Sequence, residues 1–370
     1  MTFLIFVFIL GLLIIVHEAG HFLMARKLGV RVEEFAFGFG PKLCGWKKGD
    51  TDYRICAIPL GGYVKMAGDE RINCKGAPDE YFSKSHGHRA LIVIMGPVVN
   101  YALAYLCFVA VFWLGAVDLD ASSRAMPAKV GNVIAGSAAQ QAGFLPSDVI
   151  TAIDGVKVSN WAEMQEKIVA SQGESLEMEL VRAQAPVILK VTPKMEETKD
   201  IFGKKHPVAR LGIQPVSFDK PEHLVVKKYG LGRSFIEGAR ELWNITVKTY
   251  VALWEIVTGQ RSAKEGMTGL VGIFFIVKFA TGIGFSFLLH IIGVISASLA
   301  LFNVLPIIPL DGGHLALLGL EKGRGRPLSE RTEDWVMKSG FVLIVALALF
   351  VFYVDFERIG LIDKVVSFFR

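Results

Sequence analysis

The residues best placed to do chemistry stand close together near the start of the chain, in the run His17-Glu18-Ala19-Gly20-His21. Two histidines four positions apart share one face of a helix, so both imidazoles can reach the same metal ion. The glutamate beside them can take a proton from a water molecule that the metal makes more acidic. The spacing H-E-x-x-H therefore predicts a zinc site, with His17 and His21 as ligands and Glu18 as general base for hydrolysis.

A catalytic zinc site normally has three protein ligands, so one more must come from elsewhere in the chain. Asp311 closes a long uncharged run and follows Pro306 and Pro309, which bend or end a helix. The carboxylate of Asp311 is the preferred third ligand. His314, three residues later, is the competing candidate.

Four apolar runs are long enough to hold these residues inside a lipid bilayer. They cover residues 3–25, 91–117, 285–310 and 336–354, and hydrophobic residues make up 52% of the chain. A hydrocarbon core of about 30 Å needs about 20 residues of helix. Ionisable groups inside a span are costly, so the H-E-x-x-H residues in the first run are expected to serve a function. No basic residue precedes that run, which favours a retained helix over a cleaved signal.

The placement of positive charge predicts how the chain is oriented. Twelve Lys and Arg residues lie between Arg26 and Arg89, and five more lie between Lys322 and Lys338. Because basic loops favour the cytoplasmic side, the N-terminus, residues 118–284 and the C-terminus are expected outside. All four cysteines fall in the predicted inner loop or a span, which argues against a disulfide framework. The basic residues are scattered over loops, so nucleic acid is not expected as a partner.

The polar stretch between the second and third runs is predicted to form a small α+β domain, residues 125–216. Strand patterns occur at residues 130–135, 149–153, 176–181 and 187–191. Two helices are expected between them, one after the N-cap Ser137 and one after the N-cap Asn160.

This domain resembles a bacterial PDZ domain in the order of its short motifs, which are Gly136-Ser137-Ala138-Ala139, Ala142-Gly143-Phe144 and Ile153-Asp154-Gly155. In such domains the C-terminus of a peptide adds as a strand to a sheet edge. The resemblance makes Leu211, Gly212 and Ile213 candidate substrate-binding residues. A closed domain that only shapes access to the membrane is the equal alternative.

Residues 217–284 are predicted to lie along the membrane surface. Apolar residues recur between residues 234 and 258 at intervals of three, four and seven, as in an amphipathic interfacial helix. Residues 268–284 are apolar but short and interrupted by glycines, which favours an interfacial or re-entrant segment, with a fifth crossing as the alternative. The predicted fold is a multi-pass α-helical membrane protein with about four transmembrane helices, two in residues 1–117 and two in residues 285–370.

Together these motifs resemble the site-2 protease family, in its bacterial form that acts in regulated intramembrane proteolysis. The matching pieces cover nearly the whole chain in the expected order: the H-E-x-x-H run, Gly96-Pro97-Val98-Val99-Asn100, the stretch from Ile58 to Met66, the PDZ-like insert, Leu270-Val271-Gly272-Ile273, and Asn303 with Leu310-Asp311-Gly312. The resemblance implies zinc ligation by His17, His21 and Asp311 and catalysis by Glu18. It also implies that Asn303 lies near the substrate or the developing oxyanion.

The resemblance further implies a membrane-associated β-hairpin in the cytoplasmic-side region before residue 117. Its residues Gly62, Tyr63, Val64, Lys65 and Met66 would pair with an unwound substrate segment, because a transmembrane helix hides its peptide bonds in internal hydrogen bonds. Asn100, midway along the second run, could bond to the opened substrate backbone or hold neighbouring helices together; the two readings have equal weight.

The expected function is zinc-dependent cleavage of single-pass membrane proteins, such as anti-sigma factors or remnant signal peptides, after a first cut by another protease. The expected location is a bacterial inner membrane, with the active site near the cytoplasmic face and the PDZ-like domain outside. Two rival classes are a membrane scaffold that binds peptide C-termini and a metal transporter. The scaffold has no need of His17, Glu18, His21 and Asp311 together, and a transporter predicts further ligands along a path.

Overall fold

The computed structural model describes residues 1–199, 205–215, 224–266 and 268–358. The predicted boundary between residues 216 and 217 lies outside these residues, as do residue 267 and the predicted C-terminal segment from residue 359 to 370.

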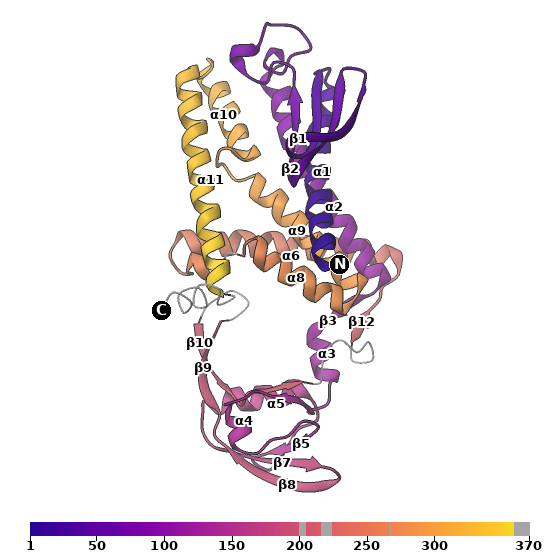
Figure 1. Ribbon diagram of the computed structural model, residues 1–370, viewed down its shortest axis with the longest axis vertical. Coiled ribbons are helices and arrows are strands. Elements are labelled where there is room, and N and C mark those ends of the chain that lie inside the picture. Colours follow the sequence, from indigo (N-terminus) through magenta and orange to yellow (C-terminus); the bar gives the residue numbers. More distant parts are fainter. Residues whose placement is uncertain (200–204, 216–223, 267, 359–370) are drawn as a thin grey trace.

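Four helices in the described residues are long and apolar enough to cross a membrane: α1 Thr2–Lys27, α2 His86–Leu114, α9 Phe285–Asn303 and α11 Glu330–Arg358. They correspond to the four apolar runs, so the prediction of a multi-pass helical protein is confirmed. Leu13 of α1 is fully buried in a cluster that reaches α8 and α9. Figure 1 shows α1, α2 and α9 crossing one another, with α11 standing to one side.

The third apolar run does not form one continuous helix. Helix α9 ends at Asn303, residues 304–310 are irregular, and helix α10 Asp311–Arg324 begins at Asp311. Pro306 and Pro309 lie inside the irregular stretch, where their missing N–H groups cannot continue a helix. The expected span to residue 310 is therefore too long by seven residues, whereas the expected break at the prolines is confirmed.

A folded β-sheet joins α1 to α2. Strands β1 Val32–Lys48 and β2 Thr51–Met66 each bend, so the sheet has four rows rather than the two of a simple hairpin. Residues 34–37 pair with residues 62–65 on one side and with residues 52–55 on the other, and residues 42–48 pair with residues 51–56. Within the described residues, the row 62–66 has a neighbouring strand on one side only. The short helices η1 Arg71–Asn73 and η2 Tyr81–Ser83 follow before α2.

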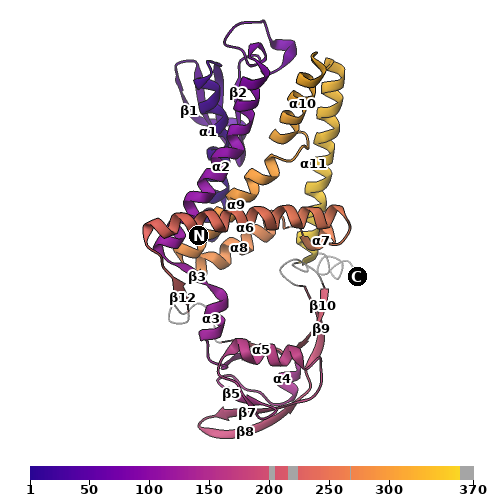
Figure 2. The ribbon, with the colours of Figure 1, turned by 180° about the vertical axis from the view of Figure 1, so that it is seen from behind.

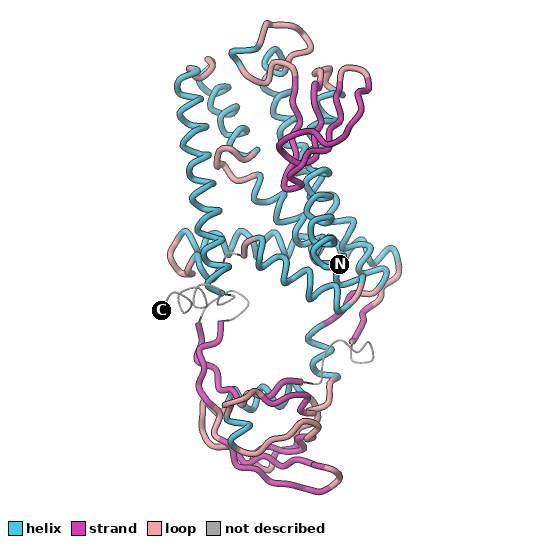
Figure 3. Tube along the Cα trace, in the orientation of Figure 1, coloured by secondary structure: helices cyan, strands magenta, loops and turns pink. Residues whose placement is uncertain are grey.

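A separate α+β unit lies at the far end of the molecule from this sheet, and Figure 3 shows most strands gathered at these two ends. Its four-stranded sheet has the order β6-β5-β7-β8, and strand β4 pairs with β11. Met164 and Met178 are fully buried in its core. The bounds are β4 Val130–Val133, α4 Ala138–Gln141, β5 Val149–Ile153, β6 Val156–Lys157, α5 Trp161–Ala170, β7 Leu176–Arg182, β8 Ala185–Val191 and β11 Ile213–Pro215.

Shorter elements connect this unit to the helical bundle. On one side they are β3 Ala116–Asp118, which pairs with β12 Val225–Lys227, and α3 Leu119–Ala125. A ribbon of β9 Lys194–Lys199 and β10 Lys205–Arg210 extends from the opposite side of the unit toward the bundle (Figure 1). The unit matches the predicted strands and helices, and its PDZ character stays a prediction.

Helix α6 Leu231–Val257 lies across the bundle between the transmembrane helices and the α+β unit (Figure 2). Its exposed side chains include the large apolar residues Phe235, Trp243 and Trp254 and the basic residues Arg233 and Arg240. This mixture suits a helix in the interface plane of a bilayer. Two further helices follow, α7 Ala263–Gly266 and α8 Leu270–Ile283. The 14 residues of α8 span about 21 Å, too short to cross the hydrocarbon core alone.

Candidate metal centre

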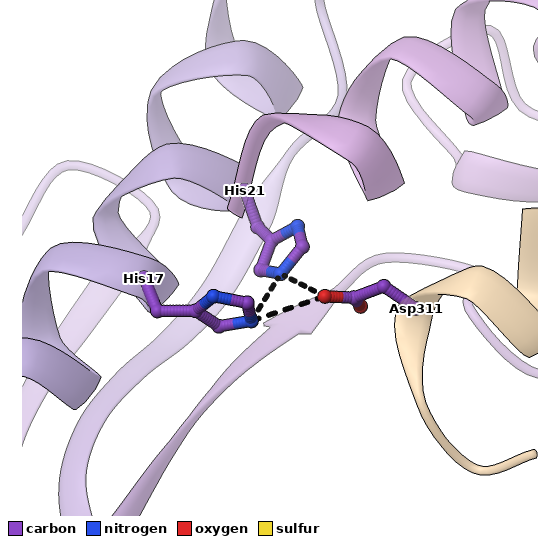
Figure 4. A group of neighbouring side chains, drawn as sticks. All are labelled: His17, His21 and Asp311. Carbon is purple, nitrogen blue, oxygen red and sulfur yellow. Dashed lines mark hydrogen bonds and ion pairs between the residues drawn. The ribbon is translucent and has the colours of Figure 1, made fainter. Parts of the chain in front are cut away.

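Three side chains from two distant elements meet between α1 and the start of α10 (Figure 4). His17 and His21 lie one helical turn apart on α1, and their Nε2 atoms are 3.3 Å apart. Oδ2 of Asp311 lies 3.1 Å from Nε2 of His17 and 3.6 Å from Nε2 of His21. Both histidines are buried, with 8% of each exposed. The structure thus brings together the three residues that the sequence predicts as ligands.

The spacing of these three atoms fits zinc. A tetrahedral site with bonds of about 2.0–2.1 Å separates its ligand atoms by about 3.3 Å, close to the three distances observed. Oδ2 of Asp311 is buried and receives no hydrogen bond of good geometry from the described residues. A buried carboxylate oxygen that faces two imidazole nitrogens in this way is suited to bind a cation jointly with them.

The orientation of His21 supports the same conclusion. Its Nδ1 lies 2.9 Å from the backbone oxygen of Ile92 in α2. Because a carbonyl oxygen only accepts hydrogen bonds, Nδ1 carries a proton, and in the neutral ring Nε2 then presents its lone pair to the centre. Sequence patterns could not point to Ile92, because a backbone oxygen leaves no signature in residue type.

Close backbone approach between α1 and α2 makes this bond possible. A Cβ atom at Gly20 would collide with the backbone oxygen of Met95, and one at Gly96 would collide with the ring of His21. Glycine at both positions lets the two helices touch where the histidines lie. The motif residue Gly96 therefore has a structural role that the sequence could not specify.

Glycines also shape the turn that presents Asp311. A Cβ atom at Gly312 would collide with the backbone oxygens of Val304 and Leu305, and one at Gly313 would lie 2.6 Å from the backbone nitrogen of Ile308. The start of α10 thus folds tightly against the irregular stretch after α9. This packing fixes the position from which the Asp311 carboxylate projects.

A cavity of about 1070 Å³ opens onto this group. Its wall includes Glu18 and Asn303, the two predicted catalytic residues, and the edge row of the β-sheet through Gly62, Tyr63, Val64 and Met66. Tyr81 lies in the same wall, and burial raises the pKa of its hydroxyl to about 12, so this side chain stays neutral at physiological pH.

Other predicted residues lie outside the metal group. His314 lines the cavity, but the cluster of ligand atoms comprises His17, His21 and Asp311. Lys65 belongs to the edge row without lining the cavity, and its Nζ lies 3.8 Å from Glu33.

Asn100 lies on α2, where it is fully buried next to α9, and it does not line the cavity. The hydroxyl group of Ser296 in α9 donates a hydrogen bond of 2.8 Å to the backbone oxygen of Asn100. The side-chain atoms Nδ2 and Oδ1 of Asn100 have no hydrogen-bond partner among the described residues, so substrate contact and helix packing both stay predictions for this residue.

The predicted peptide-binding residues lie in the α+β unit, away from the metal group. Leu211 is buried, and its backbone oxygen accepts a hydrogen bond from Ala139. The backbone oxygen of Gly212 accepts one from Ile134, and Ile213 pairs with Val133. Peptide binding by these residues stays a prediction.

Comparison with known proteins agrees with this geometry. The model of Peptidase family M50 matches residues 5–347. A Clostridium acetobutylicum protein named Putative zinc metalloprotease is 35% identical over 342 residues, which cover 92% of this chain and 93% of the relative. The regulator of sigma-E protease RseP of Escherichia coli is 29% identical over an alignment of 450 residues, which covers 96% of this chain and 98% of the relative.

These similarities extend over both halves of the metal group and over the apolar helices, and they show the enzyme class as well as the fold. The predicted zinc cofactor and the predicted metalloprotease activity are confirmed at this level. The chain belongs to Peptidase family M50 and is a bacterial multi-pass membrane zinc metalloprotease.

Proposed function

We propose that this enzyme cleaves transmembrane segments of single-pass membrane proteins after another protease has removed their outer domain, as in regulated intramembrane proteolysis. One observation carries the proposal: the metal group of His17, His21 and Asp311 lines the same cavity as a sheet edge that has no further strand beside it among the described residues. A hydrolytic centre inside the bundle needs both a metal group and a way to hold an unwound peptide.

His17, His21 and Asp311 would hold the zinc ion through their two Nε2 atoms and Oδ2. Bound zinc supplies Lewis-acid chemistry, which lowers the pKa of water and polarises a carbonyl group. The fixed Nε2 of His21 and the acceptor Oδ2 of Asp311 suit this task because both present lone pairs to one point.

Glu18 would act as the general base. It follows His17 on α1 and lines the cavity beside the metal group. A Cβ atom at Gly62 would lie 3.2 Å from Cγ of Glu18, so the edge row of the sheet passes directly by this carboxylate. A substrate strand lying along that row would therefore have its peptide bonds within reach of Glu18, which could take a proton from water and deliver it to the leaving amine.

The edge row would hold the substrate in extended form. A transmembrane helix satisfies its backbone groups internally, and cleavage requires that these hydrogen bonds be exchanged for others. Residues 62–66 offer backbone groups on their open side, so a substrate strand can add to the sheet there. Gly62 to Met66 are accordingly proposed as substrate-binding residues, with Asn303 as the hydrogen-bond donor nearest the developing oxyanion.

The α+β unit would control which proteins reach the cavity. It lies beyond α6, at the opposite end of the bundle from the β-sheet (Figure 1). With the basic loops in the cytoplasm, the active site would lie near the cytoplasmic face of the inner membrane and the α+β unit outside. A bulky uncut outer domain on a substrate would collide with this unit. It could also capture new peptide C-termini through Leu211, Gly212 and Ile213.

The test uses the full chain in detergent with a labelled transmembrane peptide, comparing wild type with Glu18→Gln. We expect about one zinc per chain in both proteins and a loss of cleavage of about 10²–10⁴-fold in the variant, the range that a general base contributes. The matched control is Glu166→Gln, which alters an exposed acid on α5 of the α+β unit. Equal cleavage by Glu18→Gln and wild type would remove Glu18 from the mechanism. A wild type that binds peptide C-termini but cleaves nothing would favour the scaffold.

A further inference from the structure

A second buried charge cluster lies on α10, three helical turns after Asp311. Glu321 is 3% exposed, and its carboxylate contacts basic groups from a different part of the chain. Arg71 of η1 donates a short hydrogen bond to Oε1, and Nη2 of Arg89 lies 3.6 Å from Oε2. Nε2 of His86 lies 3.7 Å from the same oxygen. The backbone nitrogen of Leu328 donates a hydrogen bond of 3.1 Å to Oε1.

An aromatic ring holds the two arginines in place. The guanidinium carbon of Arg71 lies 4.5 Å from the ring centre of Phe82, and that of Arg89 lies 5.1 Å from it. Cation–π contacts of this kind are stronger when water is excluded. Arg89 is 4% exposed, so the cluster is a buried tie between α10 and the segment that leads into α2.

The tie connects α10, which carries Asp311, to α2, whose backbone orients His21. Arg89 lies one turn before Ile92, whose backbone oxygen orients His21, and two turns before Gly96, which contacts the histidine rings. Glu321 lies on the helix that begins with Asp311. Helices α2 and α10 therefore meet at two levels, once at the metal group and once at Glu321.

Without the contacts of Glu321 with Arg71 and Arg89, few contacts would hold α10 in place. Its first residue follows the irregular stretch 304–310, and the next helix, α11, is largely exposed along its apolar length. In the described residues the main packing partner of α10 is α2. A helix fixed only at its first turn could tilt and carry the Asp311 carboxylate away from the histidines.

We propose that Glu321, held by Arg71 and Arg89, is a positioning residue that sets the Asp311 carboxylate against His17 and His21 and thereby raises the affinity of the enzyme for zinc. The inference rests on Asp311 being a zinc ligand, as the proposed function has it. Partners that orient metal ligands are typically worth 10–100-fold in affinity.

The experiment measures zinc affinity, by equilibrium dialysis of the full chain in detergent against a graded zinc chelator. Glu321→Gln is expected to raise the zinc dissociation constant about tenfold. The matched control is Glu237→Gln, which weakens the ion pairs with Arg233 and Arg240 within α6 and removes none of the contacts of Glu321. An unchanged affinity in Glu321→Gln would overturn the proposal.

A double variant separates positioning from general damage. In an Asp311→Asn background there is no carboxylate to position, so adding Glu321→Gln should change the zinc affinity less than about twofold. A tenfold loss in that background would show that Glu321 acts on the fold rather than on Asp311. Should Glu321→Gln fail to fold, Arg71→Gln removes the same tie from the other side and must show the same dependence on Asp311.

The same series separates this inference from the proposed function. If Asp311→Asn alone leaves zinc affinity at the wild-type level, the ligand assignment fails. If Asp311→Asn loses zinc while Glu321→Gln keeps it, only the positioning role fails.

Discussion

The metal group and the α+β unit are built in opposite ways. In the α+β unit, the four-stranded sheet pairs strands that lie close in the sequence, such as β7 and β8, and the pairing of β4 with β11 closes the unit over a longer separation. The metal group joins His17 to a carboxylate 294 positions later and depends on helices that touch through Gly20 and Gly96. The first is an assembly of local parts, and the second exists only when the whole bundle is in place.

This difference predicts that the two regions fail separately. Changes at helix contacts should weaken zinc binding while leaving the α+β unit folded. Changes in the core of that unit should unfold it while leaving zinc bound. The following variants test that separation, from the largest expected effect to the smallest.

The largest effect is expected from Gly96→Ala. The added methyl group would collide with the ring of His21 and push α1 away from α2. A displacement of about 1 Å at a catalytic group can cost about 100-fold in rate, and we expect that loss in cleavage together with weaker zinc binding. Cleavage rate and zinc content of the purified variant check this. Gly87→Ala, on the same helix with open space around it, is the control and should behave as wild type.

Asp148→Asn should act only on the α+β unit. Arg182 donates hydrogen bonds of 2.8 Å to both oxygens of this buried carboxylate. Burial alone would raise the pKa of Asp148, but the bonds from Arg182 lower it below its ordinary value of 3.8. We expect the variant to lose about 2 kcal/mol of local stability, less than a fully buried pair because Arg182 is partly exposed.

Hydrogen exchange of peptides from β5 and β7 in the full chain measures this loss. Since the folded-state pKa of Asp148 is lowered, its contribution is complete above about pH 4 and disappears as the pH falls through the folded-state value. Wild type and variant should therefore converge in exchange rate at low pH. Loss of zinc from Asp148→Asn at neutral pH would contradict the separation of the two regions.

The smallest effect is expected within the edge row of the sheet. Tyr63 lines the cavity and donates a hydrogen bond of 2.8 Å to Glu34, whereas Lys65 does not line it. Tyr63→Ala should lower kcat/KM about tenfold, equivalent to about 1.4 kcal/mol, mainly through KM. Lys65→Ala should change it less than twofold. A larger loss in Lys65→Ala than in Tyr63→Ala would mean that the substrate strand lies elsewhere.

The same contrast explains how much the sequence could predict. Local signals were sufficient in the α+β unit: Ser137 and Asn160 cap α4 and α5 through hydrogen bonds to Gln140 and Glu163, as predicted. The four transmembrane helices also followed from apolar runs, because a bilayer imposes length and hydrophobicity on each helix alone.

Features that depend on distant contacts were harder to predict. The sequence already favoured Asp311 over His314, but the distances among the three ligand atoms depend on the turn after α9. The four rows of the sheet depend on the bends in β1 and β2, which residue patterns do not specify. Glu321 reads as an ordinary polar residue in sequence, since its contact with Arg71 joins positions 250 residues apart. The role of such a residue can be recognised only from its contacts in the folded bundle.

The most direct test of the account is the zinc content of three purified proteins: wild type, Asp311→Asn and His314→Asn. Both changed residues lie at the start of α10 and line the same cavity, so each is a control for the other. We predict about one zinc per chain in wild type and in His314→Asn, and little or none in Asp311→Asn. Zinc retained by Asp311→Asn and lost from His314→Asn would contradict the assignment of the metal centre.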